Sequence, residues 1–354
     1  MGLNRSFWKN KNVFLTGHTG FKGAWMTMLL THLGAKVTGF SLQPITIPNL
    51  FDKAKVVDLL VEDYRQDIAN LDNIKSALQS AEPDIVIHMA AQSLVIESYH
   101  DPVTTFATNI MGTINVLEAI RSVDSIQSGL MITTDKCYEN KESVTGYTEQ
   151  DRLGGLDPYS NSKACAELAI SSYQSSFFST QNSVQIASAR AGNVIGGGDW
   201  SVNRLIPDCV KAFSQNKQVD LRSPNSIRPW QHVLEPLSGY LLLIEKLHTS
   251  SGKFNSAWNF GPNSEGEVDT RSLVDQVAEL WGDDAGVIIS NERSDFAETG
   301  VLKLDSSKAR KKLHWQPRWN IQTMLEKTVE WYKYDLEGKS SFEITNRQID
   351  EYLS

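Results

Sequence analysis

The sequence predicts an α/β fold in which a doubly wound parallel sheet is joined by a smaller, interleaved C-terminal lobe. The first observation is an apolar run at residues 12–16 that leads into a glycine-rich turn and then into an apolar stretch with helical spacing. The second is the alternation of strand-like and helix-like stretches up to Arg190, as in β-α-β units with right-handed crossovers. The third is a change of composition after Arg190, where Gly, Trp, Pro and Arg become frequent.

The glycine turn TGHTGFKG lies between the first predicted strand and the first predicted helix. Gly17 allows a tight turn, Gly20 lets a phosphate approach the backbone, and Gly23 lets the helix pack closely. The free N–H groups at the start of such a helix bind a pyrophosphate. We therefore expect a Rossmann dinucleotide-binding turn rather than an ordinary strand–helix turn, with the cofactor contacted by Gly17, His18, Thr19, Gly20, Phe21, Lys22 and Gly23.

A second strand is predicted at residues 36–40, and Ser41 follows it. An acidic residue that holds the adenosine ribose is expected at this place in an NAD-binding fold. Because Ser41 stands there instead, the sequence leaves NAD and NADP both open, with NAD as the expected cofactor. A buried strand at 84–88 leads into MAAQS, whose small residues allow close backbone approach. His88 ends that strand and is expected to be a hydrogen-bonded core residue.

The later predicted elements continue the alternation of strands and helices. Asp101 and Pro102 are typical of a helix start. After residue 190, a helix at 233–248 and a strand at 257–260 are predicted to return to the sheet. The remaining predictions are a helix at 101–122, a strand at 130–134, a helix at 159–178, a strand at 184–190, and lobe helices at 270–281, 306–313 and 321–334.

No internal repeat or low-complexity linker separates the two parts of the sequence. The lobe is therefore expected to be interleaved with the sheet domain rather than hung from it. The expected division is a dinucleotide-binding domain of residues 1–190, joined by about 231–260, and a lobe of residues 191–230 and 261–354 that binds the second ligand.

Composition restricts the classes of partner. The chain has 354 residues, 40% of them hydrophobic and 21% charged, with a net charge of -8. This charge gives no general attraction to nucleic acid or to anionic membranes. The three cysteines show no paired spacing, which is typical of a reducing compartment. Since the sequence has no secretion signal and no apolar stretch of membrane-spanning length, we expect a cytoplasmic protein without nucleic-acid or membrane partners.

One Tyr-x-x-x-Lys motif is formed by Tyr159 and Lys163. Residues at this spacing share one face of a helix, so the ammonium can lie beside the phenol. A nearby cation lowers the pKa of a phenol, which makes it a better general base. The alternative is a solvated pair on a helix surface. Because the motif follows a predicted strand that ends in Thr134, we favour a catalytic role.

Taken together, these motifs resemble the extended short-chain dehydrogenase/reductase family over nearly the whole chain. Within that family, ITTDKCY resembles dehydratases that act on nucleotide-linked glucose, and RAGNVIGGGDW and RPWQHVLEPL resemble members that act on CDP-glucose. The resemblance is carried by TGHTGFKG, Asp67-Ile68, HMAAQ, Asn109 with Gly112-Thr113, the set Thr134, Tyr159 and Lys163, Arg190, and RPWQHV. It implies further cofactor contacts from Ser41, Asp67, Ile68, Met89, Ala90, Ala91, Asn109, Tyr159 and Lys163.

The resemblance implies a three-step reaction on the hexose that needs no metal. Tyr159 would take the proton of the 4-hydroxyl while hydride leaves C4 for the nicotinamide, and Thr134 would hydrogen-bond that oxygen. Lys163 would lower the tyrosine pKa and bind the nicotinamide ribose. Asp135 would be the acid for the C6 hydroxyl and Lys136 the base at C5, so that water is eliminated across C5–C6. Hydride then returns to C6, and the cofactor ends as it began.

Asp135 and Lys136 each need a shifted pKa for these roles. Burial would keep Asp135 protonated and Lys136 neutral. As neighbouring ions, however, the two would stabilise each other's charged forms, and such a pair can titrate as one unit. The sequence leaves open which effect dominates. The alternative is a surface Asp-Lys turn, and dTDP-glucose relatives carry Asp-Glu at this place.

Arg204 and Arg228 are candidate partners for a diphosphate in this acidic chain, because guanidinium groups bind phosphate oxygens bidentately. The resemblance implies that Asn193, Arg204 and Arg228 hold the diphosphate of the sugar nucleotide. A structural role in the lobe is the alternative for Arg228. Gln92 and Glu97 are expected on the sugar side of the pocket. None of these residues distinguishes cytosine from uracil or thymine.

Two other functions stay open, namely an epimerase or simple dehydrogenase of the same family and a non-catalytic dinucleotide-binding regulator. Asp135 and Lys136 argue against an epimerase, because 4-epimerisation needs no acid at C6. The intact set of Thr134, Tyr159 and Lys163 argues against a regulator, because a sensor needs no base for hydride transfer.

Helices 101–122 and 159–178 can pair with a second copy as a four-helix bundle, so we expect a homodimer or a homotetramer. The alternative is that both helices only cover their own sheet. The reaction implied by the resemblance would serve deoxysugar synthesis for a bacterial surface polysaccharide such as O-antigen.

Overall fold

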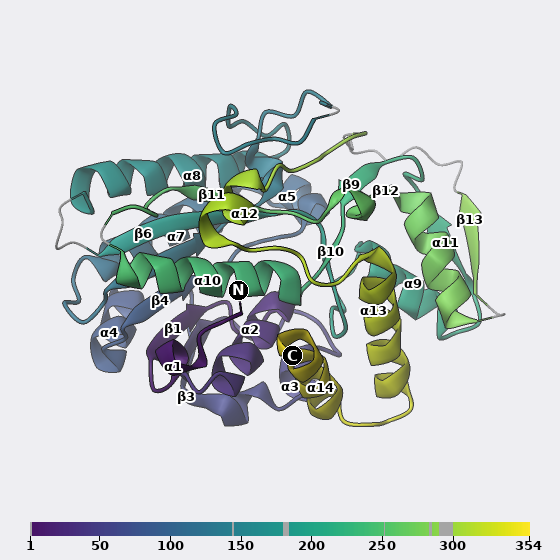
Figure 1. The fold of residues 1–354 in the computed structure, drawn as a ribbon, viewed down its shortest axis with the longest axis horizontal. Helices are drawn as coiled ribbons and strands as arrows, with labels where there is room; N and C mark the ends of the chain where they lie inside the picture. Colours follow the sequence, from purple (N-terminus) through teal and green to yellow (C-terminus); the bar gives the residue numbers. More distant parts are fainter. Residues whose placement is uncertain (1, 144, 180–183, 251, 283–284, 290–299) are drawn as a thin grey trace.

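A seven-stranded parallel sheet forms the centre of the computed structural model, which describes all residues except 1, 144, 180–183, 251, 283–284 and 290–299 (Figure 1). The strand order is β11-β6-β5-β4-β1-β2-β3, and each neighbouring pair is parallel. The order changes direction at β1, which confirms the doubly wound arrangement. The strands are β1 (Asn12–Thr16), β2 (Lys36–Ser41), β3 (Leu60–Arg65), β4 (Ile85–His88), β5 (Ser128–Ile132), β6 (Gln185–Ala191) and β11 (Ala257–Phe260).

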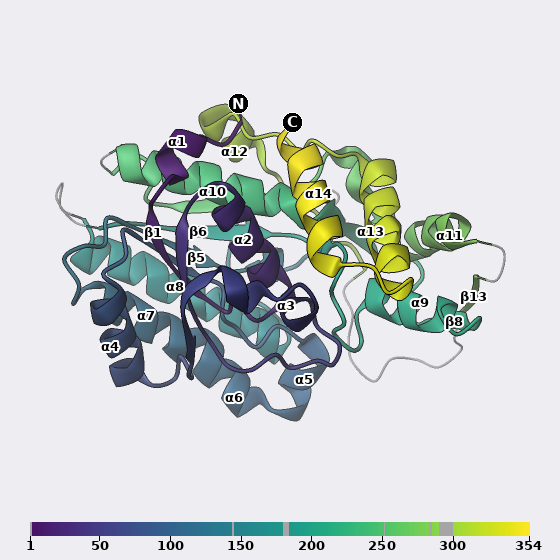
Figure 2. The ribbon, with the colours of Figure 1, turned by 90° about the horizontal axis from the view of Figure 1, so that it is seen from below.

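Helices cover both faces of this sheet (Figures 1 and 2). Alternate side chains of β1 point to opposite faces, as a strand requires. Val13 and Leu15 join one apolar core, and Phe14 joins the other. The first core is covered by α2 (Phe21–His32) and α10 (Leu234–Thr249), and the second by α4 (Leu71–Ala81), α7 (Gly112–Ile120) and α8 (Pro158–Phe177).

The single helix predicted at 101–122 is divided in the structure. Asp101 caps its start as expected, and α6 (Pro102–Phe106) is followed by a π-helical turn at Ala107–Met111 before α7 begins. The side chain of Asn109, within this turn, bonds the loop after β4. A π turn of this kind inside a helix often accompanies a functional site.

The lobe contains short paired strands and an outer layer of helices. The predicted return of the chain to the sheet is confirmed, because β11 pairs with β6 in parallel. The strand pairs are β7 (Val194–Ile195) with β10 (Gln231–His232), β9 (Ile227–Pro229) with β12 (Glu267–Asp269), and β8 (Gln218–Leu221) with β13 (Gly286–Ile289). The helices are α9 (Leu205–Phe213), α11 (Thr270–Trp281), α12 (Ser307–Leu313), α13 (Ile321–Leu336) and α14 (Ser341–Leu353).

The C-terminal helix α14 was not predicted from the sequence, and it packs against α2 and the short helix α3 (Leu50–Lys53). The Tyr352 hydroxyl donates to a carboxylate oxygen of Glu235 at 2.6 Å and so ties α14 to α10. Other short helices are α1 (Arg5–Trp8) and α5 (Val95–His100). The end of the chain is thus fastened beside the helix that follows the glycine turn (Figure 2).

Three further observations concern membranes, disulfides and metals. None of the described helices is both long and apolar enough to cross a membrane. Cys137, Cys165 and Cys209 are free thiols. Within the described ranges, no group of three or more His, Cys, Asp and Glu side chains is arranged to hold a metal ion.

Candidate active site

A cavity of about 850 Å³ lies at the carboxyl ends of the parallel strands. Residues of the lobe line the side of the cavity opposite the strand ends, so the cavity lies between the sheet and the lobe. Doubly wound sheets bind their ligands at this edge, near the change in strand order. The ends of β1, β2, β4, β5 and β6 reach the cavity through Gly17, Ser41, Met89, Thr133 and Gly192.

The glycine turn after β1 forms one end of the cavity. Gly17 has a φ of +77°, and a Cβ there would lie 2.6 Å from the Ala90 nitrogen. A Cβ on Gly23 would lie 2.0 Å from the Gly17 oxygen, so the turn itself, rather than the sheet, excludes a side chain there. The N-cap of α2 is Gly20, which offers no side-chain hydrogen bond. The first N–H groups of α2 are therefore available to an anion such as a pyrophosphate.

Most of the other predicted cofactor residues line this end of the cavity. The Ser41 and Thr19 hydroxyls bond each other at 2.8 Å, and Thr19 also donates to the Leu42 carbonyl at 3.0 Å. This hydroxyl pair occupies the place where an acidic residue was expected. The cavity-lining residues that were predicted here are Gly17, Thr19, Gly20, Phe21, Lys22, Gly23, Ser41, Asp67, Ile68, Met89, Ala90 and Ala91.

The side chain of His18 does not follow this prediction. It is fully buried behind the turn, against Gly39, where a Cβ would lie 2.6 Å from the imidazole ring. Its Nε2 bonds the Asp63 carboxylate at 2.9 Å. Burial lowers the pKa of His18, although Asp63 opposes this effect. His18 therefore joins the turn to β3 instead of lining the cavity.

Gln92 and Asn109 were also expected at the ligands, but both lie just outside the cavity lining. The Asn109 side chain accepts from the Gln92 amide at 2.9 Å and donates to the Gln92 carbonyl at 2.9 Å and to Ser162 at 2.8 Å. Thr105 accepts a further bond from the Gln92 side chain at 2.8 Å. These bonds fix the loop after β4 against the π turn and α8, which is a positioning role.

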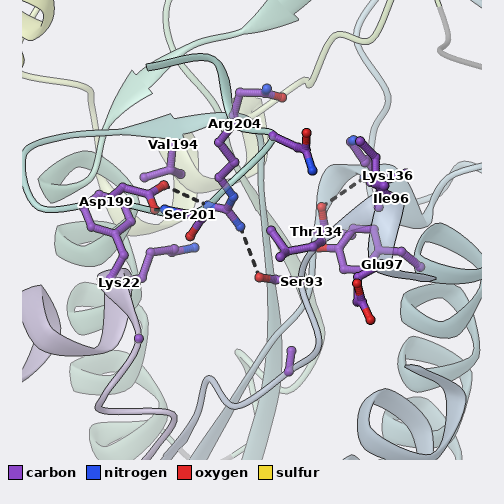
Figure 3. Close-up of a pocket in the computed structure, with 18 of the residues that line it drawn as sticks. Lys22, Ser93, Ile96, Glu97, Thr134, Lys136, Val194, Asp199, Ser201 and Arg204 are labelled. Atoms are coloured by element: carbon purple, nitrogen blue, oxygen red, sulfur yellow. Dashed lines mark hydrogen bonds and ion pairs between the residues drawn. The ribbon is translucent and has the colours of Figure 1, made fainter. Parts of the chain in front are cut away.

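The turn after β5 carries the predicted acid and base. The strand predicted at 130–134 in fact ends at Ile132, because Thr134 caps a short 3-10 turn formed by Asp135–Cys137. The Thr134 hydroxyl donates to Asp135 Oδ1 at 3.1 Å. Lys136 is half-buried and lines the cavity beside Thr134 (Figure 3).

Asp135 is 2% exposed, which excludes the surface turn considered as an alternative. Burial raises the pKa of its carboxyl to about 6, against the opposing effects of Lys136, the Thr134 hydrogen bond and Arg228. For Asp135, then, desolvation outweighs the attraction of the neighbouring ammonium. Its Oδ2 is buried without a hydrogen-bond partner in the described part of the chain. A buried carboxyl of this kind is suited to donate a proton to a ligand oxygen.

Tyr159 and Lys163 lie on one face of α8 and are 8% and 4% exposed. Burial raises the pKa of Tyr159 to about 12, although a hydrogen bond with Thr134 and the charge of Arg204 act in the other direction. The expected lowering of the tyrosine pKa is not seen, because desolvation outweighs both. Burial also lowers the pKa of Lys163 to about 8, and its ammonium donates to the Ile132 carbonyl at 3.3 Å.

Glu167, which the sequence analysis missed, holds this helix face to the sheet. Its carboxylate is 4% exposed and accepts from Ser188 at 2.7 Å and from Arg190 at 2.7 Å. It also accepts a short bond from Thr133, which directly precedes the turn that carries Asp135. The charge of Glu167 raises the pKa of Lys163 and so supports the ammonium form. The i, i+4 spacing from Lys163 is the sequence signal that could have identified it.

Lys22 is a half-buried lysine of the glycine turn, and it lines the cavity. Its ammonium donates to the Tyr240 hydroxyl at 3.3 Å. Burial lowers the pKa of Lys22 to about 7, with help from the charges of Arg204 and Lys163 and against Asp135. Lys22 lies on the same side of the cavity as Arg204 (Figure 3), so a diphosphate bound there would meet both cations.

Arg204 links the lobe to the sheet domain. Its guanidinium pairs with Asp199 at 3.2 Å and donates to the Ser93 hydroxyl at 3.1 Å (Figure 3). Arg228 is 8% exposed and donates to the carbonyls of Ile227 and Gly300 at 2.9 and 3.2 Å. Both arginines line the cavity, as do the predicted residues Asn193 and Glu97.

His88 fits the expectation of a core residue. Its ring bonds Thr16 at 2.7 Å and Thr113 at 3.2 Å. Complete burial lowers the pKa of His88 to about 3, so the ring is neutral at ordinary pH. It therefore connects β1, β4 and α7 beneath the cavity.

Comparison with known proteins places these features in a wider group. Residues 14–328 match the family described as GDP-mannose 4,6 dehydratase. The chain is 46% identical over 356 residues to the CDP-glucose 4,6-dehydratase of Salmonella typhimurium, and the match covers 99% of each sequence.

Solved structures share the fold at lower sequence identity. The dTDP-glucose 4,6-dehydratase of Bacillus anthracis in complex with NAD superposes with a TM-score of 0.76 at 22% identity, covering 94% of this chain and 99% of that one. A UDP-glucose-4-epimerase from Stenotrophomonas maltophila, with bound NAD and formylated UDP-arabinopyranose, gives a TM-score of 0.80 at 20% identity, covering 93% and 100%. The predicted Rossmann fold is therefore confirmed.

Proposed function

This chain belongs to the GDP-mannose 4,6 dehydratase family of extended short-chain dehydrogenase/reductases, and from that membership we propose that it is an NAD-dependent CDP-glucose 4,6-dehydratase. The reaction converts CDP-glucose into CDP-4-keto-6-deoxyglucose and water. The identity with the Salmonella enzyme over the whole chain supports the choice of substrate. The observation that carries the chemistry is the buried carboxyl of Asp135, with its unpaired Oδ2, on the same turn as Thr134.

The cavity fits a dinucleotide at its glycine end, because the turn leaves uncapped N–H groups and no Cβ in the way. NAD, when bound, accepts a hydride from C4 of the hexose and returns it at C6. Within the chain, the hydroxyls of Ser41 and Thr19 are proposed to face the adenosine, and Lys163 is proposed to bind the nicotinamide ribose. Lys22 supplies a cation near the first turn of α2.

Proton transfer at the 4-hydroxyl falls to Tyr159 in this proposal. The hydrogen bond with Thr134 holds the phenol oxygen at the end of β5 and lowers the pKa of Tyr159. Lys163, whose ammonium form is supported by Glu167, favours the phenolate form of Tyr159, which then takes up the proton of the 4-hydroxyl. In the complex the Thr134 hydroxyl is proposed to turn from Asp135 Oδ1 and to donate to the oxygen that becomes the 4-ketone.

The ketone makes the C5 hydrogen acidic, and elimination follows. Lys136 takes the C5 proton as a neutral amine, while Asp135 gives a proton to the C6 hydroxyl. The C6–O bond breaks and water leaves with the proton from Asp135. As C6 is then reduced, the Lys136 ammonium would return a proton to C5, so the product differs from the substrate by one water. The raised pKa of Asp135, about 6, leaves a protonated fraction near neutral pH for this step.

Arg204 and Arg228, with Asn193, are proposed to hold the diphosphate of the substrate. Glu97 is proposed to border the hexose. Gln92 supports this region through its bonds to Asn109 and acts as a positioning residue. Because Arg204 also bonds Ser93, the diphosphate site joins the lobe to the sheet domain.

We also propose a homodimer or homotetramer that works in the cytoplasm. Exposed apolar side chains on the helices named for this role support pairing with a second copy. Val103 on α6 is 77% exposed, and Leu168 and Phe177 on α8 are 61% and 46% exposed. The three free thiols agree with a reducing compartment. The proposed product would enter deoxysugar synthesis for a bacterial surface polysaccharide.

The test is to incubate the purified protein with CDP-glucose and NAD and to measure the alkaline absorbance of a 4-keto sugar. The proposal expects this product without net accumulation of NADH. Steady NADH release would instead indicate a dehydrogenase, and a C4 epimer would indicate an epimerase. Binding of NAD and CDP-glucose without any product would indicate a regulator.

A further inference from the structure

The nucleoside of the proposed substrate must lie at the lobe end of the cavity. In the proposed complex the hexose lies near Thr134 and Tyr159 and the diphosphate near Arg204 and Arg228, which puts the base beyond the arginines. There the lining comes from the first turn of α9 and from β8. These two elements pack against each other.

The lining at this end is apolar on one side. Val219 and Leu221 alternate with exposed residues along β8, and both are buried. Ile206 and Pro207, at the start of α9, are also buried. All four border the cavity, so they can form flat apolar contacts with a pyrimidine ring.

One part-buried carboxyl, Asp208, lines the cavity at this end. It stands one helical turn after Arg204, and its backbone N–H bonds the Arg204 carbonyl at 3.0 Å. Residues at this spacing share a helix face, so both side chains border the same stretch of the cavity. Asp220 is a second carboxyl lining this end, and it is exposed to solvent.

The polar groups around Asp208 include both cations and a carboxylate. Burial and the charge of Asp199 raise the pKa of the Asp208 carboxyl, and the charges of Arg222 and Lys211 and a hydrogen bond from the Asn203 backbone amide act against this rise. An ionised carboxylate has room for about four hydrogen bonds. The Asn203 amide uses one of these positions, which leaves capacity for a ligand donor.

We propose that the Asp208 carboxylate selects cytosine over uracil and thymine by accepting a hydrogen bond from the exocyclic amine of the base. This inference rests on the proposed function, because it takes a pyrimidine sugar nucleotide as the substrate. Cytosine carries an amino group where uracil and thymine carry a carbonyl oxygen. A carboxylate bonds the amine and repels the carbonyl, so one residue both favours the first base and rejects the other two.

The test compares CDP-glucose with UDP-glucose for the wild type, Asp208→Asn and Asp220→Asn. The ratio of kcat/KM values should favour CDP-glucose in the wild type and fall by about 10- to 100-fold in Asp208→Asn, because an amide can donate to the uracil oxygen. The matched control Asp220→Asn, which removes the exposed carboxyl, should keep the wild-type ratio. An unchanged ratio in Asp208→Asn, or a loss in Asp220→Asn alone, would overturn the proposal.

Binding measurements separate this inference from the proposed function. Dissociation constants for CDP and UDP, measured by calorimetry, should show the same loss of preference without any turnover. Equal melting temperatures and NAD affinities for the three proteins would show that the variants are folded. If CDP-glucose gives no 4-keto sugar, the proposed function fails, whereas the CDP-over-UDP preference still decides the role of Asp208.

Discussion

The two ends of the cavity, which are proposed to hold the cofactor and the hexose, are built in different ways. The cofactor end is built from backbone, with Gly17 and Gly23 packed too closely for any side chain and the first N–H groups of α2 uncapped. The hexose end is built from buried side chains, and burial moves the pKa values of Asp135, Tyr159 and Lys163. Changes at the first end should therefore affect binding, and changes at the second should affect proton transfer.

The largest expected effect separates these two ends most clearly. Lys136→Met should lower turnover of CDP-glucose by about 1,000-fold, because general acid–base groups contribute on the order of 100- to 10,000-fold. NAD affinity should stay at the wild-type value, since Lys136 lies away from the glycine turn. Lys141→Met is the matched control, because that side chain is 71% exposed. Full turnover in Lys136→Met would remove Lys136 as the base.

The second-largest effect is expected for Asp135→Asn, which should raise the free energy of unfolding while it abolishes elimination. The pKa of Asp135 rises from 3.8 to about 6 on folding, so the folded protein holds a proton that the unfolded chain loses in this pH window. Stability from this group therefore falls as pH rises through the window and stays lower above it. Asp135→Asn should be more stable than the wild type by at most about 3 kcal/mol at pH 8.

Urea unfolding at pH 4 and at pH 8 measures this difference. The gain should fall below about 1 kcal/mol at pH 4, because the carboxyl is protonated in the folded protein and only about half ionised in the unfolded chain. Elimination should be lost at both pH values. Equal stability of the two proteins at pH 8 would contradict the assignment of Asp135 as a desolvated carboxyl.

The third effect belongs to the cofactor end. A Cβ at position 23 would collide with the Gly17 carbonyl, so Gly23→Ala must displace the turn. Overpacking of this kind costs about 1–3 kcal/mol, and if this cost is carried by the NAD site, NAD affinity falls by about 5- to 150-fold. CDP affinity should be unchanged, because the lobe end lies apart from the turn. Equal losses for NAD and CDP in calorimetry would show that the two ends are not independent.

The smallest expected effect concerns Glu167, whose negative charge favours the ammonium form of Lys163. Glu167→Gln keeps the shape of the side chain but removes its charge, so the pKa of Lys163 should fall below about 8. Lys163 in this variant therefore loses its proton, and with it its charge, at a lower pH than in the wild type. In an Asp135→Asn background, where elimination is blocked, the pH dependence of C4 oxidation can be followed by NADH absorbance.

The high-pH limb of this oxidation should move down by about one pH unit in the double variant. A purely structural role for Glu167 would lower the rate equally at every pH and leave the limb in place. That outcome would restrict Glu167 to holding Thr133 and Arg190.

The sequence predicted the parts that depend on neighbouring residues. The glycine turn, the parallel strands and the Tyr159–Lys163 face follow from spacing over a few residues, and the structure has all three. The division of the helix at 101–122 was missed, because the π turn coincides with bonds from Asn109 to a loop distant in sequence. Helix α14 was missed as well.

Burial was harder to predict because it depends on distant packing. The sequence left open whether desolvation or Lys136 would govern Asp135, and the structure shows that desolvation dominates. His18 lies in the middle of the predicted cofactor motif, yet its side chain is buried behind the turn. Gly39 leaves space for the ring there, and Asp63 bonds it. A role for Asp208 could not be predicted from the sequence, because it depends on α9 and β8 lying together at the lobe end of the cavity.

The most direct test of the account follows deuterium from C4 of CDP-glucose into the product. If the hydride removed from C4 is kept in the cavity and returned to the same sugar after elimination, mass spectrometry and NMR should find the deuterium at C6 of the 4-keto-6-deoxy sugar. The C5 position should exchange with solvent, because Lys136 removes that proton. Deuterium lost to solvent, retained at C4 or accumulated in free NADH would contradict the account.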